Sequence, residues 1–203
     1  MNPPWPNRLC AAAVGKKALK EQRTSCSEPA QQVFLGLGSN IGNRLEQLDS
    51  AVGRLRALLD SLTVSSIYET DPMYVSDQPR FLNLVVAGCS VLEPSALLRC
   101  TAQIEADAGR RRDPAQANGP RPLDIDILLY GDRVVDTDTL QIPHPRLHER
   151  RFVLQPLLEI APSARDPRNG RALAELLRRL PEQGVYCYRA KPYNRARSKE
   201  QHT

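Results

Sequence analysis

The sequence predicts an α+β fold in which one antiparallel β-sheet carries two helices on one face. Two observations support this prediction. The patterned part of the chain is ordered strand, helix, strand, strand, helix, strand, and both helical segments repeat apolar residues at intervals of three and four. This order is that of the ferredoxin-like βαββαβ sandwich. The second face of the sheet must also be covered, and we expect two long polar loops, residues 71–80 and 110–121, to cover it and to hold substrates.

The first half of this pattern begins at residues 33–38, "VFLGLG", a short apolar run closed by glycines that predicts a buried strand. Residues 43–60 predict a helix, with Asn43 as its N-cap. The stretch "TVSSIYET", residues 63–70, predicts a second strand. The polar segment "DPMYVSDQPR" that follows contains two prolines and is predicted to be a loop.

The second half repeats the order. Residues 81–92, "FLNLVVAGCSVL", predict a long strand, and residues 93–109 predict a helix with a proline in its first turn and a glycine at its end. After the second polar loop, "LDIDILLY" at residues 123–130 predicts the last strand of the pattern. A hairpin-like stretch after residue 132 and a helix around residues 173–180 complete the expected elements.

Length and composition fit one domain, which we place at residues 32–190. Residues 1–31 are expected to be a disordered extension and residues 191–203 a flexible basic tail. No run of about 18 apolar residues is present, so no membrane partner is expected. Five scattered cysteines without a CxxC pair argue for reduced thiols. We therefore expect a cytoplasmic protein, and a monomer.

The net charge of +5 is unevenly distributed: residues 1–32 carry +3, residues 33–142 carry −5 and residues 143–203 carry +7. An acidic centre does not fit a basic nucleic-acid groove, so no nucleic-acid partner is expected. A ferredoxin-like RNA-binding module is nevertheless the alternative suggested by the fold and by a pI of 9.1. The aromatic content of 5% and the absence of an aromatic cluster on the predicted strands argue against it.

Two aspartates interrupt the last apolar strand. Side chains two residues apart in a strand share a face, so Asp124 and Asp126 point one way. The alternate residues, Leu123, Ile125 and Ile127, point into the core. Two carboxylates about 6–7 Å apart on a rigid strand can chelate a hard cation through oxygen. The alternative is that both are merely solvated on an edge strand.

Four arginines bracket the second loop, at positions 110, 111, 112 and 121. Guanidinium groups match pairs of phosphate oxygens, so arginines near a carboxylate pair suit a metal-bound polyphosphate; the alternative is a solvated charge run. On the preceding strand, Phe81 and Asn83 share a face. An aromatic ring beside an amide suits a flat heterocycle with hydrogen-bonding edges, although Phe81 alone could equally belong to the core.

Two other motifs argue against particular binding sites. The glycine pattern in "GLGSNIGN" is one residue too long for a dinucleotide-binding fingerprint, and the chain contains no P-loop. An NAD-dependent oxidoreductase is therefore disfavoured. His144 and His148 have a metal-ligand spacing, but Pro143 and Pro145 oppose a helix there. His144 as a nucleotide contact and His144 as a structural residue both remain open.

Five motifs together resemble the 6-hydroxymethyl-7,8-dihydropterin pyrophosphokinase family of folate biosynthesis, over residues 33–162. They are "LGSNIGN", "SSIYET", "QPRFLNLV", "GPRPLDIDILLYG" and "IPHPRLHERRFVLQPLLEIAP". The resemblance implies a ferredoxin-like pyrophosphokinase domain. It also implies an enzyme that moves the β,γ-pyrophosphoryl group of ATP onto the hydroxymethyl oxygen of a reduced pterin and releases AMP.

The resemblance further implies roles for individual residues. Asp124 and Asp126 would bind two Mg²⁺ ions, and Arg110 and Arg121 would stabilise charge on the moving group. The pterin would be held by two stacking rings, one hydrogen-bonding amide and a stretch of backbone, namely Phe81, Phe152, Asn83, Thr70, Asp71 and Met73. The nucleotide side would be lined by Glu105, Arg112, His144 and Arg150. Asn118 and Pro145 depart from the pattern, since some members have tryptophan and tyrosine there.

Overall fold

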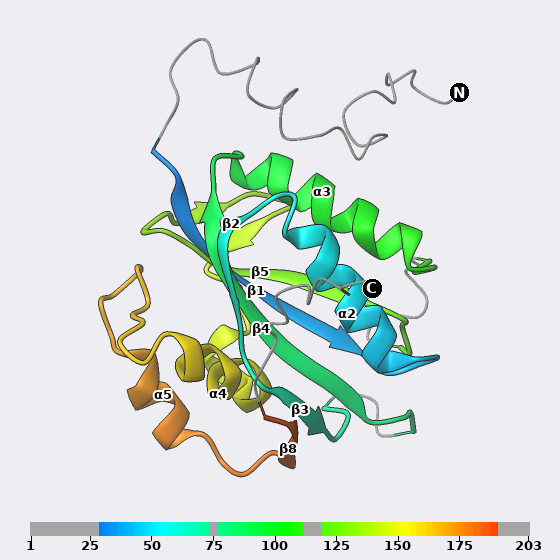
Figure 1. Ribbon diagram of the computed structural model, residues 1–203. Helices are drawn as coiled ribbons and strands as arrows, with labels where there is room; N and C mark the ends of the chain where they lie inside the picture. Colours follow the sequence, from blue (N-terminus) through cyan, green and yellow to red (C-terminus); the bar gives the residue numbers. More distant parts are fainter. Residues whose placement is uncertain (1–28, 74–76, 112–118, 191–203) are drawn as a thin grey trace, which may run out of the picture.

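The computed structural model describes residues 29–73, 77–111 and 119–190 of the chain (Figure 1). Nearly all of the expected N-terminal extension, the expected tail at residues 191–203 and the candidate Arg112 lie outside the described residues. No helix in the described ranges combines the length and the apolar character needed to cross a membrane.

One antiparallel sheet organises the fold. Its strands are β1 (Gln31–Ser39), β2 (Asp60–Val64), β3 (Ile67–Thr70), β4 (Phe81–Ser90), β5 (Asp124–Tyr130) and β8 (Val185–Arg189). The strand order is β5-β1-β4-β3-β8, and β2 also pairs with β4. The last strand of the predicted pattern therefore lies beside the first, and the third lies on the other side of the first. This is the ferredoxin-like arrangement, so the predicted fold class is confirmed.

The sheet departs from the predicted strands in two places. The strand expected at residues 63–70 is divided into β2 and β3 at Ser65 and Ser66. The hydroxyl of Ser65 accepts a hydrogen bond from the Val85 amide at 2.9 Å, and the amide of Ser66 donates to the carboxylate of Glu159 at 2.9 Å. These side-chain bonds replace regular ladder bonds and break the strand. The second departure is β8, an edge strand that the sequence pattern did not predict.

Two helices cover one face of the sheet, as predicted. They are α2 (Arg44–Leu55) and α3 (Pro94–Asp107), and the apolar core between them and the sheet includes Leu123, Ile125 and Ile127 (Figure 1). The side chain of Asn43 caps α2 by accepting a hydrogen bond from the Glu46 amide at 3.3 Å. The helix ends five residues before the predicted boundary.

The opposite face is covered by helices rather than by the long loops, so that expectation was wrong. The covering helices are α4 (Arg151–Ile160) and α5 (Leu173–Arg179), which lie on the side of the sheet away from α2 and α3 (Figure 1). A second apolar core lies beneath them and includes Val85, Leu128 and Leu154. The predicted helix around residues 173–180 is thus confirmed, and the predicted hairpin after residue 132 consists of β6 (Val135–Asp136) and β7 (Gln141–Ile142).

The face beneath α4 changes character along each strand, and this change positions the site. On β4 the residues on this face run from Phe81 and Asn83 to Val85, and on β5 they run from Asp126 to Leu128. The apolar residues lie under α4, and the polar and aromatic residues lie beyond it. Among the described residues no helix covers the polar end, and a cleft lies there.

Candidate functional site

Most of the predicted site residues line this one cleft. The predicted residues on its wall are Thr70, Asp71, Met73, Phe81, Asn83, Arg121, Asp124, Asp126, Arg150 and Phe152. They come from β3, β4, β5, the start of α4 and both long loops. The period-two reasoning that placed Phe81 with Asn83, and Asp124 with Asp126, therefore agrees with the structure.

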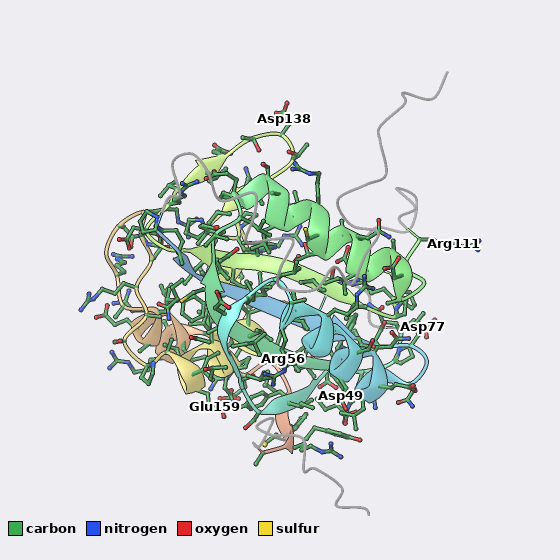
Figure 2. All side chains as sticks on the ribbon, turned by 45° about the horizontal axis from the view of Figure 1, so that its top comes forward. Asp49, Arg56, Asp77, Arg111, Asp138 and Glu159 are labelled. Carbon is green, nitrogen blue, oxygen red and sulfur yellow. The ribbon has the colours of Figure 1, made fainter. Side chains whose placement is uncertain are left out.

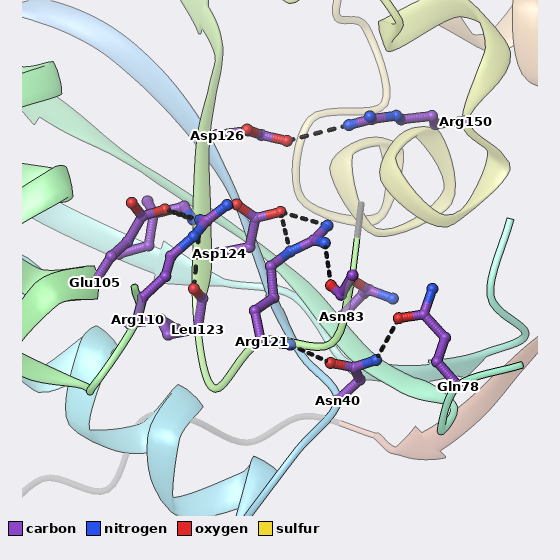
Figure 3. Close-up of polar contacts among 12 residues, drawn as sticks. Asn40, Gln78, Asn83, Glu105, Arg110, Arg121, Leu123, Asp124, Asp126 and Arg150 are labelled. Carbon is purple, nitrogen blue, oxygen red and sulfur yellow. Dashed lines mark hydrogen bonds and ion pairs between the residues drawn. The ribbon is translucent and has the colours of Figure 1, made fainter. Parts of the chain in front are cut away.

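Asp124 lies between two arginines (Figure 3). Arg121 donates from Nε to one carboxylate oxygen at 2.8 Å, and Arg110 donates from Nη1 to the other. Burial by itself raises the pKa of Asp124, but the charges of Arg121 and Arg110 outweigh it, and the pKa lies below its ordinary value. The side chain is therefore held in its ionised form.

The negative charge of Asp126 is less completely balanced by neighbouring cations than that of Asp124. Its carboxylate accepts a hydrogen bond from Arg150 at 3.1 Å and lies 3.6 Å from Nε2 of His144. Burial and the neighbouring charge of Asp124 raise the pKa of Asp126 to about 6, against the smaller opposing effect of Arg150. Burial and the charge of Arg150 lower the pKa of His144 to about 4, so this imidazole is neutral near pH 7.

Glu105 lies behind the cleft rather than on its wall. Its side chain is 2% exposed, and its carboxylate accepts hydrogen bonds from Arg110 and from the Ile125 amide, the latter at 2.8 Å. Arg110 therefore bridges Glu105 and Asp124, and burial of its guanidinium is outweighed by these two charges, which raise the pKa of Arg110. Glu105 is therefore linked to Asp124 by its ion pair with Arg110.

The aromatic part of the cleft is formed by two phenylalanines, each with an arginine over its ring. The guanidinium of Arg121 lies 5.1 Å from the centre of the Phe81 ring, and that of Arg150 lies 5.6 Å from the centre of the Phe152 ring. Between the strands, the amide of Asn83 donates to Oγ1 of Thr70 at 2.7 Å. This bond fixes the orientation of the amide.

Gly38 forms part of the floor of the cleft. It pairs with Asn83 on β4 and with Asp124 on β5. A Cβ atom at this position would lie 2.8 Å from Oδ1 of Asn83 and 3.7 Å from the Phe81 ring. A glycine is therefore needed here for space rather than for backbone freedom.

Asn40 and Gln78 belong to the site but were not among its predicted residues. The buried side chain of Asn40 donates to Oε1 of Gln78 at 3.0 Å and accepts from the backbone amide of Arg121 at 2.7 Å (Figure 3). It thereby connects the two long loops, whose residues Asp77 and Arg111 lie on the same side of the molecule in Figure 2. The signal was present in "GLGSN", where a buried asparagine follows a strand, but only the glycines were interpreted.

A second hollow adjoins the first and shares Asp126 with it. His144 and Pro145 lie on its wall, together with residues of the β6–β7 hairpin. The departure at Pro145 therefore falls on this second hollow. Asp126 stands where the two hollows meet.

The described residues contain no cluster of three or more histidine, cysteine, aspartate or glutamate side chains that could hold a metal ion. Of the carboxylates that line the cleft in these ranges, Asp124 and Asp126 lie together on one strand, β5. Such a pair suits Mg²⁺, which commonly binds one or two carboxylates together with substrate phosphates and water.

Comparison with known proteins identifies the family. The sequence model described as 7,8-dihydro-6-hydroxymethylpterin-pyrophosphokinase (HPPK) matches residues 34–162. The chain belongs to this family. The assignment made from the sequence motifs is thus confirmed.

The chain matches one relative over almost all of that protein's length, and longer relatives over only a part of theirs. The 2-amino-4-hydroxy-6-hydroxymethyldihydropteridine pyrophosphokinase of Pseudomonas aeruginosa is 41% identical over 157 residues, which are 76% of this chain and 95% of that protein. The folic acid synthesis protein fol1 of Schizosaccharomyces pombe is 43% identical over 76% of this chain, but over only 21% of its own length. A folate synthesis bifunctional protein of Arabidopsis thaliana is 44% identical, and 27% of it is covered. The chain thus spans less than a third of these two longer relatives.

Solved structures support the fold. The HPPK-DHPS protein of Plasmodium falciparum matches with a TM-score of 0.58 at 15% identity, over 76% of this chain and 45% of that one. The same protein with pterin and p-hydroxybenzoate gives a TM-score of 0.60 at 16% identity, over 76% and 44%. At these identities the likeness shows a shared fold.

Proposed function

We propose that this chain transfers the β,γ-pyrophosphoryl group of ATP to the hydroxymethyl oxygen of 6-hydroxymethyl-7,8-dihydropterin, giving the pterin diphosphate and AMP in folate synthesis. The observation that carries the proposal is the arrangement around Asp126: an aromatic cleft with a fixed amide on one side, a second hollow on the other, and arginines at their junction. Membership of the HPPK family supports the same reaction.

The aromatic cleft is suited to the pterin. Phe81 and Phe152 offer ring faces for stacking on a flat bicycle. Asn83, whose amide is fixed by Thr70, offers a hydrogen-bonding group to the ring edge. Asp71 and Met73 line the outer wall of the same cleft. A substrate stacked there would direct its hydroxymethyl substituent toward the aspartates of β5.

The arginines are suited to the phosphates. Arg110 and Arg121 reach Asp124 from opposite sides, and Arg150 reaches Asp126, so three guanidinium groups surround the carboxylate pair. Phosphoryl-type transfer requires little covalent chemistry from the protein, and positioning and charge neutralisation provide most of the acceleration. These arginines are already held in place by ion pairs, so little reorganisation is needed as charge develops. The neutral imidazole of His144 lines the second hollow, where the nucleotide would lie. Arg150 lines the aromatic cleft and bonds to Asp126, which both hollows share.

The carboxylate pair fits Mg²⁺, and we propose that Asp124 and Asp126 hold two such ions together with ATP. Two facts support this assignment. Mg²⁺ prefers oxygen ligands such as carboxylates, and the side chain of Asp126 is 34% exposed, so an ion can approach it. When bound, the ions would neutralise the phosphate charge and hold the polyphosphate for attack. Asp124 contributes by remaining ionised between its arginines.

The test is incubation of the full chain with ATP, Mg²⁺ and 6-hydroxymethyl-7,8-dihydropterin, with nucleotide products separated by chromatography. AMP should form in step with the pterin diphosphate, and ADP should not accumulate. Asp126→Ala should abolish turnover while leaving the circular dichroism spectrum unchanged, and Asp132→Ala, an exposed aspartate after β5, should leave the rate unchanged. Formation of ADP, or normal turnover by Asp126→Ala, would contradict the proposal.

A further inference from the structure

The loop that carries Asp71, Met73 and Gln78 into the cleft is closed at its base by an ion pair. It leaves the sheet after Thr70 and returns at Phe81, which pair directly across the β3–β4 ladder. Nε of Arg80, the last residue of the loop, lies 2.8 Å from a carboxylate oxygen of Asp71, the first. The two ends are therefore tied together immediately beside the aromatic cleft.

The edge strand β8 and Gly184, the residue before it, together contact both members of this ion pair. The amide of Asp71 donates to the carbonyl of Gly184 at 3.2 Å. The guanidinium of Arg80 lies 5.5 Å from the centre of the Tyr186 ring. Figure 1 shows β8 alongside β3 at the edge of the sheet, and the register places Val185 opposite Thr70. The strand thus meets the chain at the point where it turns into the cleft.

Gly184 is fitted closely to this contact. Its φ of +56° lies in the left-handed region, which favours glycine. A Cβ atom there would lie 2.2 Å from a carboxylate oxygen of Asp71. Any side chain at residue 184 would therefore displace the carboxylate that closes the loop.

The ion pair is too exposed to be explained by global stability. The side chains of Asp71 and Arg80 are 47% and 51% exposed, and exposed pairs of this kind contribute little to the stability of a fold. The matched family segment ends at residue 162, so β8 also lies outside the residues on which family membership rests. A local role at the cleft accounts for the exposed ion pair.

We propose that β8 and the glycine before it position the heterocycle pocket: Gly184 and Tyr186 hold the Asp71–Arg80 ion pair, which sets the position of Thr70 and of the loop wall. This inference rests on the proposed function, because the pocket is taken to bind the pterin. Its consequence is selective. Disturbing β8 should weaken binding of the pterin and leave binding of the nucleotide unchanged, since the second hollow lies on β5 and the β6–β7 hairpin.

The experiment uses the full chain and four variants: Gly184→Ala, Tyr186→Ala, Arg80→Ala and Arg80→Lys. Tyr188→Ala is the matched control, because Tyr188 lies on the same strand and is 49% exposed, against 53% for Tyr186. The dissociation constants for 6-hydroxymethylpterin and for a non-hydrolysable ATP analogue with Mg²⁺ are measured by calorimetry, alongside KM, kcat and the melting temperature.

Gly184→Ala and Arg80→Ala should raise the pterin dissociation constant and KM about 10-fold, and the nucleotide constant should stay within about 2-fold of the wild type. Arg80→Lys should recover part of the loss, since it keeps the charge next to Asp71. Tyr188→Ala should behave as the wild type. Equal losses for both ligands, equal effects of Tyr186→Ala and Tyr188→Ala, or normal pterin binding by Gly184→Ala would overturn the inference.

Two outcomes separate this inference from the proposed function. A wild-type chain that forms no AMP refutes the proposed function, whatever the variants do. An active wild type with unaltered pterin binding in the β8 variants refutes the positioning role alone. If Gly184→Ala lowers the melting temperature too far for titration, Tyr186→Ala measured against Tyr188→Ala decides the question.

Discussion

Replacement of Gly38 by alanine tests whether the floor of the cleft is shaped by the space between two strands. The added Cβ would lie 2.8 Å from Oδ1 of Asn83, a distance that real Cβ atoms do not tolerate, so the amide must move. Asn83 is 7% exposed and bonded to Thr70, so it cannot move without breaking that bond. Loss of the bond costs about 0.5–1.5 kcal/mol and overpacking costs about 1–3 kcal/mol. We therefore expect Gly38→Ala to lower the free energy of unfolding by about 2–3 kcal/mol.

The pterin dissociation constant reports on the cleft floor more specifically than the free energy of unfolding does. The displaced amide no longer faces the ring edge and the floor is raised by a methyl group, so the pterin dissociation constant should rise about 10- to 100-fold. Calorimetric titration with pterin and thermal unfolding measure the two quantities. Gly53→Ala is the control, because Gly53 is exposed in α2 and no atom would lie within 4 Å of the new Cβ. Wild-type pterin affinity in Gly38→Ala would refute this account of the cleft floor.

Three further predictions follow from individual contacts. Asn40→Ala should lower kcat about 10- to 100-fold by disconnecting the two loops, and an unchanged kcat in steady-state assays would argue against this link. Burial and the charge of Asp124 raise the folded-state pKa of Asp126 to about 6, so ionisation opposes folding as pH rises through that value. In EDTA, Asp126→Asn should therefore melt above the wild type near pH 7 but level with it near pH 4; a constant difference would contradict this. Asp166→Asn should lower the free energy of unfolding, measured in urea, by about 1–3 kcal/mol, because its hydrogen bonds to Arg168 become weaker. Turnover should not change, and reduced turnover would contradict a purely structural role.

The sequence was sufficient for elements whose pattern is local. Alternation on two strands placed Asp124 with Asp126, and Phe81 with Asn83, because a strand presents every second residue to the same face whatever its neighbours are. The α2 cap at Asn43 is equally local. The motifs from residues 33–162 then identified the family, which supplied roles that alternation cannot.

Other features depend on contacts between distant residues and were not predictable in this way. The break between β2 and β3 depends on Glu159, more than ninety positions away, which binds the Ser66 amide. Four of the five residues of β8 are exposed and none is buried, so no alternation marks the strand and its pairing with β3 defines it. Glu105 was expected to face the nucleotide, but whether a glutamate in a helix reaches a cleft or lies behind an arginine depends on how that helix packs.

The helix α4 connects the stability of the fold to the chemistry of the cleft. Its apolar face, with Val153 and Leu154, seals the core on this side of the sheet. At its start, Arg150 reaches Asp126 and Phe152 lies on the cleft wall. Near its other end, Glu159 bonds to the strand break at Ser66. The same helix holds Phe152 and Arg150. Loss of the hydrogen bonds between Glu159 and Ser66 should therefore shift the Phe152 ring and the Arg150 guanidinium together. Substitution of Glu159 is therefore expected to impair substrate binding without touching the substrate.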